Sequence, residues 1–337
     1  MGRFDRHDLV PGWDQSRLAA ATVVVVGVGA LGSQLAQQLA LAGVGRLVLC
    51  DPDLVSECNL SRAPLFRTSD IGRPKAPTAA GRLMELSPVT RAEARTAPLV
   101  SGVGLAELRD ATLVVSCLDS LAARLQLTGR CQLVGVPLLD GGTSAWGGEI
   151  RLYDPTGPCF GCGLTARDRA ATDDPWACSD ATTAEAGASA PVSALIGSWL
   201  AVTVVRLLCG AVTVPGLVRV DAVGGTATPV RLRRDPDCPL HRRIPAELVA
   251  PVPHTIWSTP AELAEHIAPQ ESVLTWAPLP GSRPTRESTR LADAPPRARL
   301  ADLGIAPREI LPVLGTGRTR RIRYLELSEA GGKGTSR

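Results

Sequence analysis

A glycine-rich turn near the start of the chain is the first segment whose residues indicate chemistry. The turn, Gly27-Val-Gly29-Ala-Leu-Gly32, follows a run of valines and opens a stretch with helical spacing. Its first glycine suits a tight bend, its second lets a phosphate or ribose approach the backbone, and its third allows a helix to pack closely on a sheet. Asp51 follows about twenty residues later, where a carboxylate can accept hydrogen bonds from ribose hydroxyls. The pattern predicts nucleotide binding.

Acidic, amide and basic residues beyond this turn recur at spacings that indicate a more specific chemistry. The segment Asp51-Pro-Asp53 precedes Asn59-Leu-Ser-Arg62, and Gly72-Arg-Pro-Lys75 comes next. This spacing resembles the ThiF/MoeB/HesA family of the ubiquitin-activating superfamily, whose members carry D-x-D-x-V-x-x-x-N-L-x-R and then G-x-x-K. The resemblance implies ATP-dependent adenylation of a carboxylate, with Asp53, Asn59, Arg62 and Lys75 facing the nucleotide.

The two cations have a physical reason to be there. ATP places several negative charges where an attacking carboxylate must approach, and Arg62 and Lys75 would offset that repulsion and stabilise the pentavalent transition state. A dehydrogenase that transfers hydride does not need them. Solvated loop charges are the alternative interpretation for these two residues.

Two further motifs resemble the same family. Asp119-Ser120 and Arg124 are similar to the family pattern D-N-x-x-x-R, which implies that Asp119 coordinates Mg²⁺ with the phosphates and that Arg124 supports it. Capping of the next helix by Asp119 is the alternative. Arg3-Phe-Asp-Arg6-His7 is similar to R-Y-x-R-Q, whose second arginine reaches the nucleotide of the other subunit. Arg6 therefore implies a homodimer, with an exposed terminal charge as the alternative.

Two pairs of metal-ligand residues are separated by much of the chain. Cys159-Phe-Gly-Cys162 and Cys238-Pro-Leu-His241 supply three thiolates and one imidazole, a set that satisfies tetrahedral zinc. The family usually holds structural zinc with two C-x-x-C pairs, so the resemblance implies a zinc site in which His241 is the last ligand. Core cysteines left by a decayed site are the alternative.

The position of a cysteine nucleophile is where the sequence departs from the family pattern. Many relatives carry C-x-E-A-G before a long helix, whereas this chain has Thr183-Ala-Glu-Ala-Gly187. Cys178 lies a few residues earlier and is the candidate substitute, although no neighbouring cation would lower its pKa. Either Cys178 forms a covalent intermediate or the reaction stops at the acyl-adenylate, and the sequence slightly favours the second.

Alternating strands and helices must position these residues. Predicted strands cover residues 22–26, 46–50, 112–116, 134–139 and 149–153, and predicted helices cover 33–42, 75–85, 121–130 and 192–209. This order predicts an α/β fold of the Rossmann-like, doubly wound type, with a mostly parallel sheet and helices on both faces. Residues 157–189 are expected to form a crossover loop, and 216–221 and 226–232 a hairpin.

A change in composition divides the chain. Residues 1–243 are predicted to form the ATP-binding adenylation domain, and 244–327 a small α+β accessory domain of unknown role with helices near 260–267 and Pro307 and a strand at 322–327. Prolines and arginines cluster in this second part. Residues 328–337 are predicted to be a disordered tail.

Composition narrows the class of protein. Of 337 residues, 45% are hydrophobic and the net charge is only +3 without a long basic run, so nucleic acid is not favoured as a partner. Residues 1–17 are mostly polar and do not resemble a secretory signal, and Ser, Thr and Arg in the apolar stretch 192–208 favour a core helix over a membrane span. Nine cysteines do not suggest a secreted disulfide scaffold. We expect a cytoplasmic protein.

Three classes of function fit these patterns. The leading hypothesis is ATP- and Mg²⁺-dependent adenylation of the C-terminal carboxylate of a ubiquitin-like sulfur-carrier protein ending in Gly-Gly, which primes it for thiocarboxylate formation. A variant of it is activation of a peptide or side-chain carboxylate in natural-product biosynthesis, which the threonine at position 183 suits. The other classes are an NAD-dependent oxidoreductase and a nucleotide-binding module without chemistry.

Overall fold

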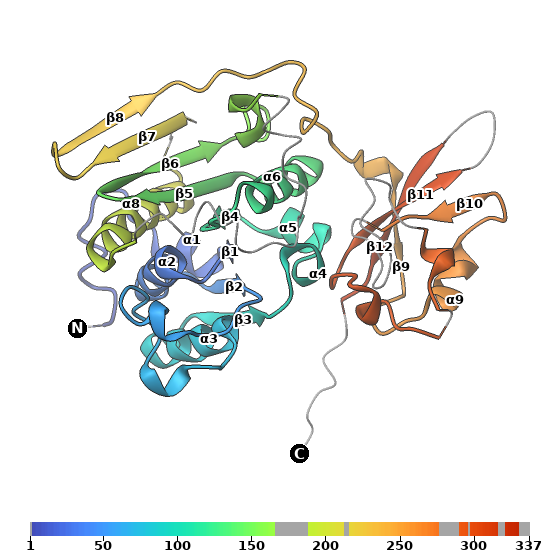
Figure 1. Ribbon diagram of the computed structural model, residues 1–337, viewed down its shortest axis with the longest axis horizontal. Coiled ribbons are helices and arrows are strands. Elements are labelled where there is room, and N and C mark those ends of the chain that lie inside the picture. Colours follow the sequence, from blue (N-terminus) through green and yellow to red (C-terminus); the bar gives the residue numbers. More distant parts are fainter. Residues whose placement is uncertain are drawn as a thin grey trace. The chain divides into compact units, whose positions relative to one another are not determined.

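The computed structural model describes residues 2–165, 188–211, 216–275, 290–295, 297–315 and 321–329. The contacts within the chain divide it into two compact units (Figure 1). The first comprises Met1–Thr96 and Asp110–Arg242, and the second comprises Ala97–Arg109 and Arg243–Arg337. The short segment between Ala97 and Arg109 thus leaves the first unit and returns to it, a feature that the composition of the sequence did not indicate.

The first unit is built on an eight-stranded sheet of order β3-β2-β1-β4-β5-β6-β7-β8. Its parallel strands are β1 (Thr22–Val26), β2 (Arg46–Cys50), β3 (Arg91–Arg95), β4 (Leu113–Ser116) and β5 (Leu138–Ser144). The antiparallel ones are β6 (Gly147–Tyr153), β7 (Gly216–Asp221) and β8 (Thr226–Val230). Strand β1 lies in the middle because its valines are buried on both faces, as in parallel sheets covered by helices.

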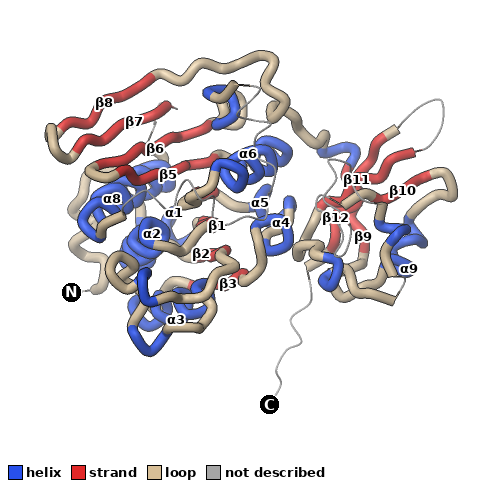
Figure 2. Tube along the Cα trace, in the orientation of Figure 1, coloured by secondary structure: helices blue, strands red, loops and turns tan. Residues whose placement is uncertain are grey.

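Helices cover both faces of this sheet. They are α1 (Gln15–Ala20), α2 (Ala30–Leu41), α3 (Lys75–Leu86), α6 (Leu121–Val134) and α8 (Ala190–Leu208). Helices α2, α3 and α8 share one apolar core with β1 and β2, and α2 and α8 lie side by side (Figures 1 and 2). Helix α6 buries its apolar residues outside that core, against β4. The predicted Rossmann-like architecture is confirmed.

Helix α8 is long and apolar enough to span a membrane by length and composition. Its inner face is nevertheless part of the protein core, because Val192, Ile196, Leu200 and Val204 are buried against the sheet and α2. Leu195 and Val202 remain exposed on its outer face. Helix α8 therefore has one face covered by the sheet and α2, and one apolar face open to solvent.

The second unit has a four-stranded sheet of order β10-β11-β12-β9. Its elements are α4 (Leu99–Gly102), α5 (Leu105–Asp110), β9 (Val249–Val252), α9 (Pro260–Leu263), β10 (Glu271–Val273), β11 (Ile310–Gly315) and β12 (Ile322–Leu327). Arg109 forms a two-pronged ion pair with Glu326 at 2.7 and 2.9 Å, which fastens α5 to β12. The predicted small α+β part is therefore present, and it includes residues from the middle of the chain.

One predicted helix in this unit is wrong. Residues near Pro307 form a turn, with Arg308 in the left-handed region at φ 56°, and the chain then enters strand β11. The apolar run that follows the turn is short and pairs on both sides, with β10 and β12, so it is buried as a strand. Within the described residues, the 3₁₀ turns are Glu57–Asn59, Thr68–Asp70, Phe160–Gly163, Ala246–Leu248, Ala264–His266, Leu291–Asp293 and Ala301–Leu303.

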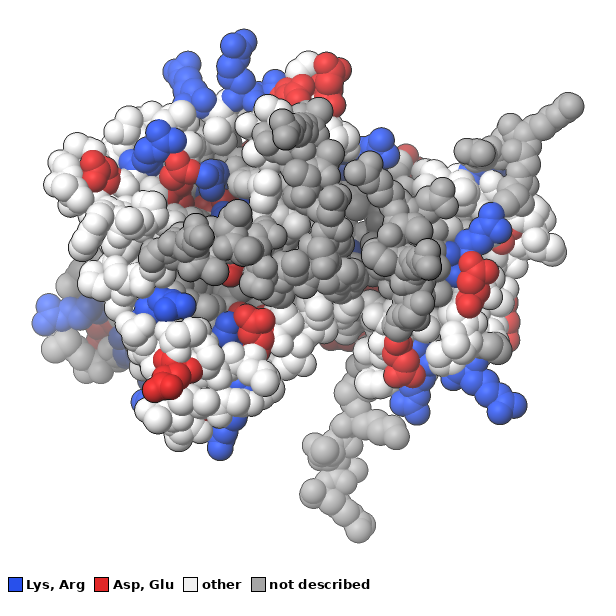
Figure 3. Space-filling model, in the orientation of Figure 1, with Lys and Arg blue, Asp and Glu red and all other residues white. Residues whose placement is uncertain are grey.

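Charge is mixed on the face of the molecule shown in Figure 3. Basic and acidic side chains alternate there without a large field of one sign. This distribution agrees with the small net charge of +3.

Candidate active site

The glycine turn joins β1 to α2 at the carboxyl edge of the sheet. Gly27 has φ +89°, and a Cβ there would lie 2.6 Å from the carbonyl oxygen of Cys117. A Cβ on Gly32 would lie 1.9 Å from the carbonyl oxygen of Gly27. Gly29, in contrast, has no atom within 4 Å of an added Cβ. The outer glycines are therefore required by packing, and the middle one leaves the helix N-terminus open to a phosphate.

Asp51 connects this turn to the acidic segment after β2. Its carboxylate accepts the backbone N–H of Val28 at 2.7 Å and that of Asp53 at 2.9 Å. The side chain is buried, and burial raises the pKa of Asp51 while the Lys75 charge opposes that shift. Asp51 thus holds the turn in place, a role that the sequence did not show. Its predicted contact with ribose hydroxyls stays a prediction.

Lys75 lies among carboxylates. Its Nζ forms an ion pair of 2.7 Å with Oδ2 of Asp53, and its backbone N–H donates to the Asp53 carbonyl at 2.9 Å. The lysine side chain is 10% exposed, so water screens its charge only weakly. The same charge acts on Asp51 and Asp119. Lys75 is therefore placed where it could meet a phosphate held between the turn and Asp119.

Asp119 projects from the loop after β4. Its side chain keeps one face open to solvent, but the surrounding protein displaces water from the rest and raises the pKa of Asp119. The nearby Asp53 carboxylate adds to this shift, and Lys75 and Arg124 oppose it. Ser120, whose Oγ accepts from the N–H of Ala123 at 3.1 Å, caps α6. Ser120 therefore takes the capping position that was the alternative for Asp119, and Asp119 is exposed and lines the cavity beside it, where a divalent cation could reach its carboxylate.

Asn59 and Arg62 lie in the short 3₁₀ turn after Asp53. Oδ1 of Asn59 accepts from the Ser56 N–H at 3.0 Å, so the side chain is buried as a cap of its own turn. Arg62 is half-buried and donates to the carbonyl oxygen of Cys58 at 2.8 Å. The Ser56 hydroxyl and the charges of Arg62 and Lys75 lower the pKa of the exposed Cys58 thiol. Arg62 and Lys75 thus act on one small region.

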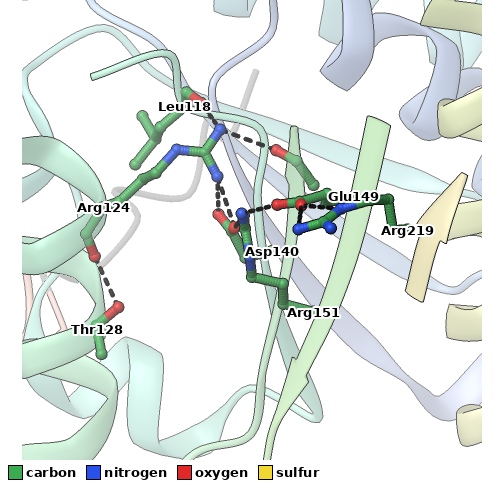
Figure 4. Close-up of polar contacts among 8 residues, drawn as sticks. Leu118, Arg124, Thr128, Asp140, Glu149, Arg151 and Arg219 are labelled. Carbon is green, nitrogen blue, oxygen red and sulfur yellow. Dashed lines mark hydrogen bonds and ion pairs between the residues drawn. The ribbon is translucent and has the colours of Figure 1, made fainter. Parts of the chain in front are cut away.

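Arg124 is held by several acceptors. It donates to both oxygens of Asp140 at 2.5 Å, to the carbonyl oxygen of Gly141 at 3.0 Å, and to the carbonyl oxygen of Leu118 (Figure 4). Asp140 is 1% exposed and also accepts from Arg151 at 2.9 Å. The sequence identified Arg124 but missed Asp140 and Arg151, which lie opposite each other in the register of β5 and β6.

A cavity of about 760 Å³ opens beside Asp119. The β5–β6 hairpin and the end of β7 form most of its wall. Its lining residues are Asp119, Leu121, Arg124, Gly142, Thr143, Ser144, Ala145, Trp146, Gly147, Gly148, Glu149, Arg151, Phe160, Arg219, Val220 and Asp221. Contacts therefore run from the glycine turn through Asp51 and Asp53 to Lys75, all within the first unit. The charges of Asp53 and Lys75 act on Asp119, which borders the cavity.

Four metal-ligand side chains gather at the far end of β6. The Sγ of Cys159 lies 3.8 Å from that of Cys162 and 3.7 Å from that of Cys238, and Sγ of Cys162 lies 3.4 Å from Nε2 of His241. All four ligand atoms lie within 4.8 Å of one another. These separations suit a tetrahedral ion with bonds of about 2.0–2.3 Å. The predicted ligands are thus brought together into a cluster that could hold a metal ion.

Two predicted residues remain to be placed. Arg6 is exposed in the N-terminal segment, and the hydrogen bonds and ion pairs given above for the site do not include it. Cys178, the candidate nucleophile, and Thr183 lie outside the residues that the structure describes. Their roles stay predictions.

The fold and the site together define a class of protein. A Rossmann-like sheet with a glycine turn, buried charges at its carboxyl edge and a cavity beside them is a nucleotide-binding enzyme scaffold. The ThiF family matches residues 6–240. The chain belongs to the ThiF family.

Curated relatives carry names of one activity. The chain is 35% identical over 251 residues to the sulfur carrier protein adenylyltransferase of Thermus thermophilus, covering 71% of this chain and 90% of the relative. It is 32% identical over 245 residues to the molybdopterin-synthase adenylyltransferase of Escherichia coli, covering 71% and 95%. Both relatives are named as adenylyltransferases.

Solved structures share the fold at lower identity. Escherichia coli MccB with ATP has a TM-score of 0.56 and 18% identity, covering 67% of this chain and 68% of that one. PaaA has a TM-score of 0.51 and 20% identity, covering 64% and 65%. These similarities support the fold of the chain.

The raised pKa of Asp119 predicts a stability cost. The folded protein makes ionisation of this carboxyl harder than it is in the unfolded chain, so its pKa is higher in the folded state. The free energy of unfolding therefore falls as the pH rises from the unfolded pKa through the folded pKa. At pH 7 without divalent cations, Asp119→Asn should raise the melting temperature by about 1–3 °C. The gain should vanish below the ordinary pKa of 3.8, where both side chains are neutral.

Thermal melts at several pH values would check this effect. Asp8→Asn, at an exposed position of the N-terminal segment, is the matched control and should leave the midpoint unchanged. A lower midpoint for Asp119→Asn at pH 7 would contradict the expectation.

Proposed function

We propose that the chain adenylates the C-terminal glycine carboxylate of a ubiquitin-like sulfur-carrier protein, with ATP and Mg²⁺ as co-substrates. The observation that carries the proposal is the group of charges at the carboxyl edge of the sheet, where Lys75 is paired with Asp53 and Asp119 borders the cavity. The family and the names of the relatives support the same activity. A carboxylate oxygen of the carrier attacks the α-phosphorus of ATP, the bond to the bridging oxygen breaks, and pyrophosphate leaves.

The chain's own residues contribute chiefly position and charge. The open N-terminus of α2 at Gly29 offers backbone N–H groups to phosphate oxygens. Lys75 and Arg62 offset the negative charge that builds up as the two anions meet. A magnesium ion held by Asp119 would neutralise phosphate charge further, and the exposed carboxylate of that residue, with the Asp53 charge nearby, fits such a cation.

The cavity supports a narrow chain as the second substrate. Gly142, Gly147 and Gly148 form part of its wall, and a Cβ on Gly148 would lie 2.3 Å from the carbonyl oxygen of Gly142. At the rim, Trp146 is 67% and Val223 77% exposed. Their turns are joined by a hydrogen bond of 2.9 Å from the Ala222 N–H to the Trp146 carbonyl. A substrate with a thin C-terminal tail could place that tail in the cavity, and its folded part could contact Trp146 and Val223. A carrier protein with an extended C-terminus fits this description.

A peptide carboxylate is the second candidate substrate. The threonine at position 183 favours it, because an acyl-adenylate that reacts directly needs no cysteine. The same fold in MccB makes this reading structurally compatible. The two candidates differ in whether a folded carrier or a short peptide is the better substrate.

Pyrophosphate exchange into ATP tests the proposed function. A carrier protein ending in Gly-Gly should stimulate exchange, and Lys75→Ala should reduce it by a factor of about 100 or more, because one buried cation at the phosphates is lost. Arg91→Ala, which removes a largely exposed cation from β3, is the matched control and should keep normal exchange. Exchange with a short peptide but not with any carrier would favour the second candidate, and exchange with neither would refute adenylation.

We also propose a homodimer in which Arg6 reaches the nucleotide of the partner. The N-terminal segment and the outer faces of α2 and α8 enclose a mainly apolar hollow of about 520 Å³. Exposed Val10, Leu41 and Val202 surround it. Burying such a surface against a second copy would be favourable.

Mixing two inactive variants tests this arrangement. If Arg6 acts across subunits, Arg6→Ala and Lys75→Ala should be inactive separately, and a mixed dimer should recover up to about a quarter of wild-type exchange, since one of its two sites is intact in half of the molecules. Arg3→Ala serves as the control at a neighbouring terminal arginine. A monomer in sedimentation, or mixtures without recovery, would argue against the proposal.

We propose structural zinc for the cluster of Cys159, Cys162, Cys238 and His241. Burial and the two neighbouring thiols raise the pKa of Cys159 in the absence of a cation. A divalent ion would reverse that by binding thiolates, which links metal binding to stability.

Metal analysis tests the zinc site. Purified protein should hold about one zinc ion per chain, and Cys238→Ser should lose it and melt at a lower temperature. Cys131→Ser, in the buried part of α6 outside the cluster, is the control for removal of a thiol and should keep the metal. Metal-free wild-type protein with the same melting temperature would overturn the assignment.

A further inference from the structure

A chain of partly buried ion pairs and a hydrogen bond connects the β5–β6 hairpin with the loop that carries Asp119. Arg151 donates to Oδ2 of Asp140 at 2.9 Å, and Asp140 accepts from Arg124 at 2.5 Å (Figure 4). Arg124 in turn donates to the carbonyl oxygen of Leu118, the residue before Asp119. Each link joins a different element: β6, β5, α6 and the loop after β4.

Asp140 is the group on which this chain depends. Its side chain is 2% exposed, so an unpaired charge there would be costly, and two guanidinium groups offset it. Arg124 is 13% exposed, and its planar group has acceptors on Asp140, Gly141 and Leu118. A planar guanidinium held at several points has little freedom to rotate. The Leu118 carbonyl is therefore fixed relative to β5.

Arg151 is itself held on several sides. Its second nitrogen donates to Glu149, whose other oxygen accepts from Arg219 at 2.9 Å, and its guanidinium lies 5.6 Å from the centre of the Phe160 ring. These contacts engage it within the protein although it borders the cavity. They argue for a structural task at this position over direct binding of the carrier's tail.

We propose that Asp140 and Arg151 are positioning residues for the metal-binding carboxylate. Acting through Arg124, they fix the Leu118 carbonyl and thereby the loop that presents Asp119 to the nucleotide-bound cation. The inference rests on the proposed function, because it takes Asp119 as the ligand of the magnesium ion. Asp140 is buried, and the guanidinium of Arg151 is engaged by Asp140, Glu149 and Phe160, so their loss should weaken the cation site and leave binding of the carrier unchanged.

Exchange kinetics at varied Mg²⁺ test the inference. Arg151→Ala should raise the KM for Mg²⁺ and lower kcat, each by about 10-fold, as losses of groups that orient metal ligands commonly do. The KM for the carrier should stay within twofold, and Arg151→Lys should recover part of the loss. Arg219→Ala is the matched control for the metal dependence alone, because it removes another cavity arginine that contacts Glu149, and its KM for Mg²⁺ should match that of the wild type.

A binding measurement separates this inference from the proposed function. Mn²⁺ binding in the presence of a non-hydrolysable ATP analogue, followed by electron paramagnetic resonance, needs no carrier and should be about 10-fold weaker in Arg151→Ala than in wild type. Absence of exchange in the wild type with intact Mn²⁺ binding would defeat the proposed function alone. An Arg151→Ala protein that matches Arg219→Ala in Mg²⁺ dependence and Mn²⁺ affinity, or that changes only the KM for the carrier, would overturn the positioning role.

Asp140→Asn provides a second variant if it folds. It keeps the shape of the side chain but removes the charge that binds both arginines, so its effect on Mn²⁺ affinity should equal or exceed that of Arg151→Ala. A normal Mn²⁺ affinity in a folded Asp140→Asn protein would count against the inference. If this variant does not fold, the comparison of Arg151→Ala, Arg151→Lys and Arg219→Ala decides the question by itself.

Discussion

The buried carboxylate of Asp51 is the contact on which the geometry of the site depends. It accepts backbone N–H groups from the glycine turn and from Asp53, which belong to segments after two different strands. Because the charge is taken out of water, these two bonds must be kept, and the two segments are fixed to each other. Asp53 then positions Lys75, so one side chain sets the place of the turn and of the main cation.

The other half of the site is organised from the opposite side of β4. Arg124 and Asp140 fasten the Asp119 loop to β5, and the Cys/His cluster closes the far end of β6. Phe160, within the turn of that cluster, packs against Arg151. The first unit thus holds Lys75 in place through Asp51 and Asp53, and it holds the Asp119 loop beside the cavity through Arg124 and Asp140. This arrangement can place charges around a phosphate chain.

Local patterns predicted the glycine turn, strands β1, β2 and β4 of the parallel sheet, and Lys75, Asp119 and the cysteine pairs as candidate site residues. They missed β3 and placed β5 four residues too early, at 134–139 instead of Leu138–Ser144. The predicted features are all recognisable from residues that lie close together in the sequence, such as the valine run before Gly27. Asp140 and Arg151 could not be found this way, because their pairing depends on the β5–β6 register, and Leu-Leu-Asp-Gly-Gly reads as the end of a core strand. Residues 97–109 belong to the second unit because of contacts with residues far away in the sequence, such as the ion pair of Arg109 with Glu326, which local patterns do not show. The helix predicted near Pro307 is absent from the described residues there, because the short apolar run that follows pairs with β10 and β12 and forms strand β11.

The glycines of the cavity wall limit how this enzyme could change its substrate. An added Cβ at Gly147 would lie 2.1 Å from the Val220 carbonyl oxygen, and one at Gly148 would meet the Gly142 carbonyl, so the sheet itself forbids larger residues there. Natural variation or protein engineering can therefore not enlarge these two residues without moving a strand. New preferences would more readily arise at exposed positions, such as Trp146 in the cavity wall and Val223 in the turn after β7. The hairpin backbone thus decides which positions of the wall can diverge and which must stay glycine.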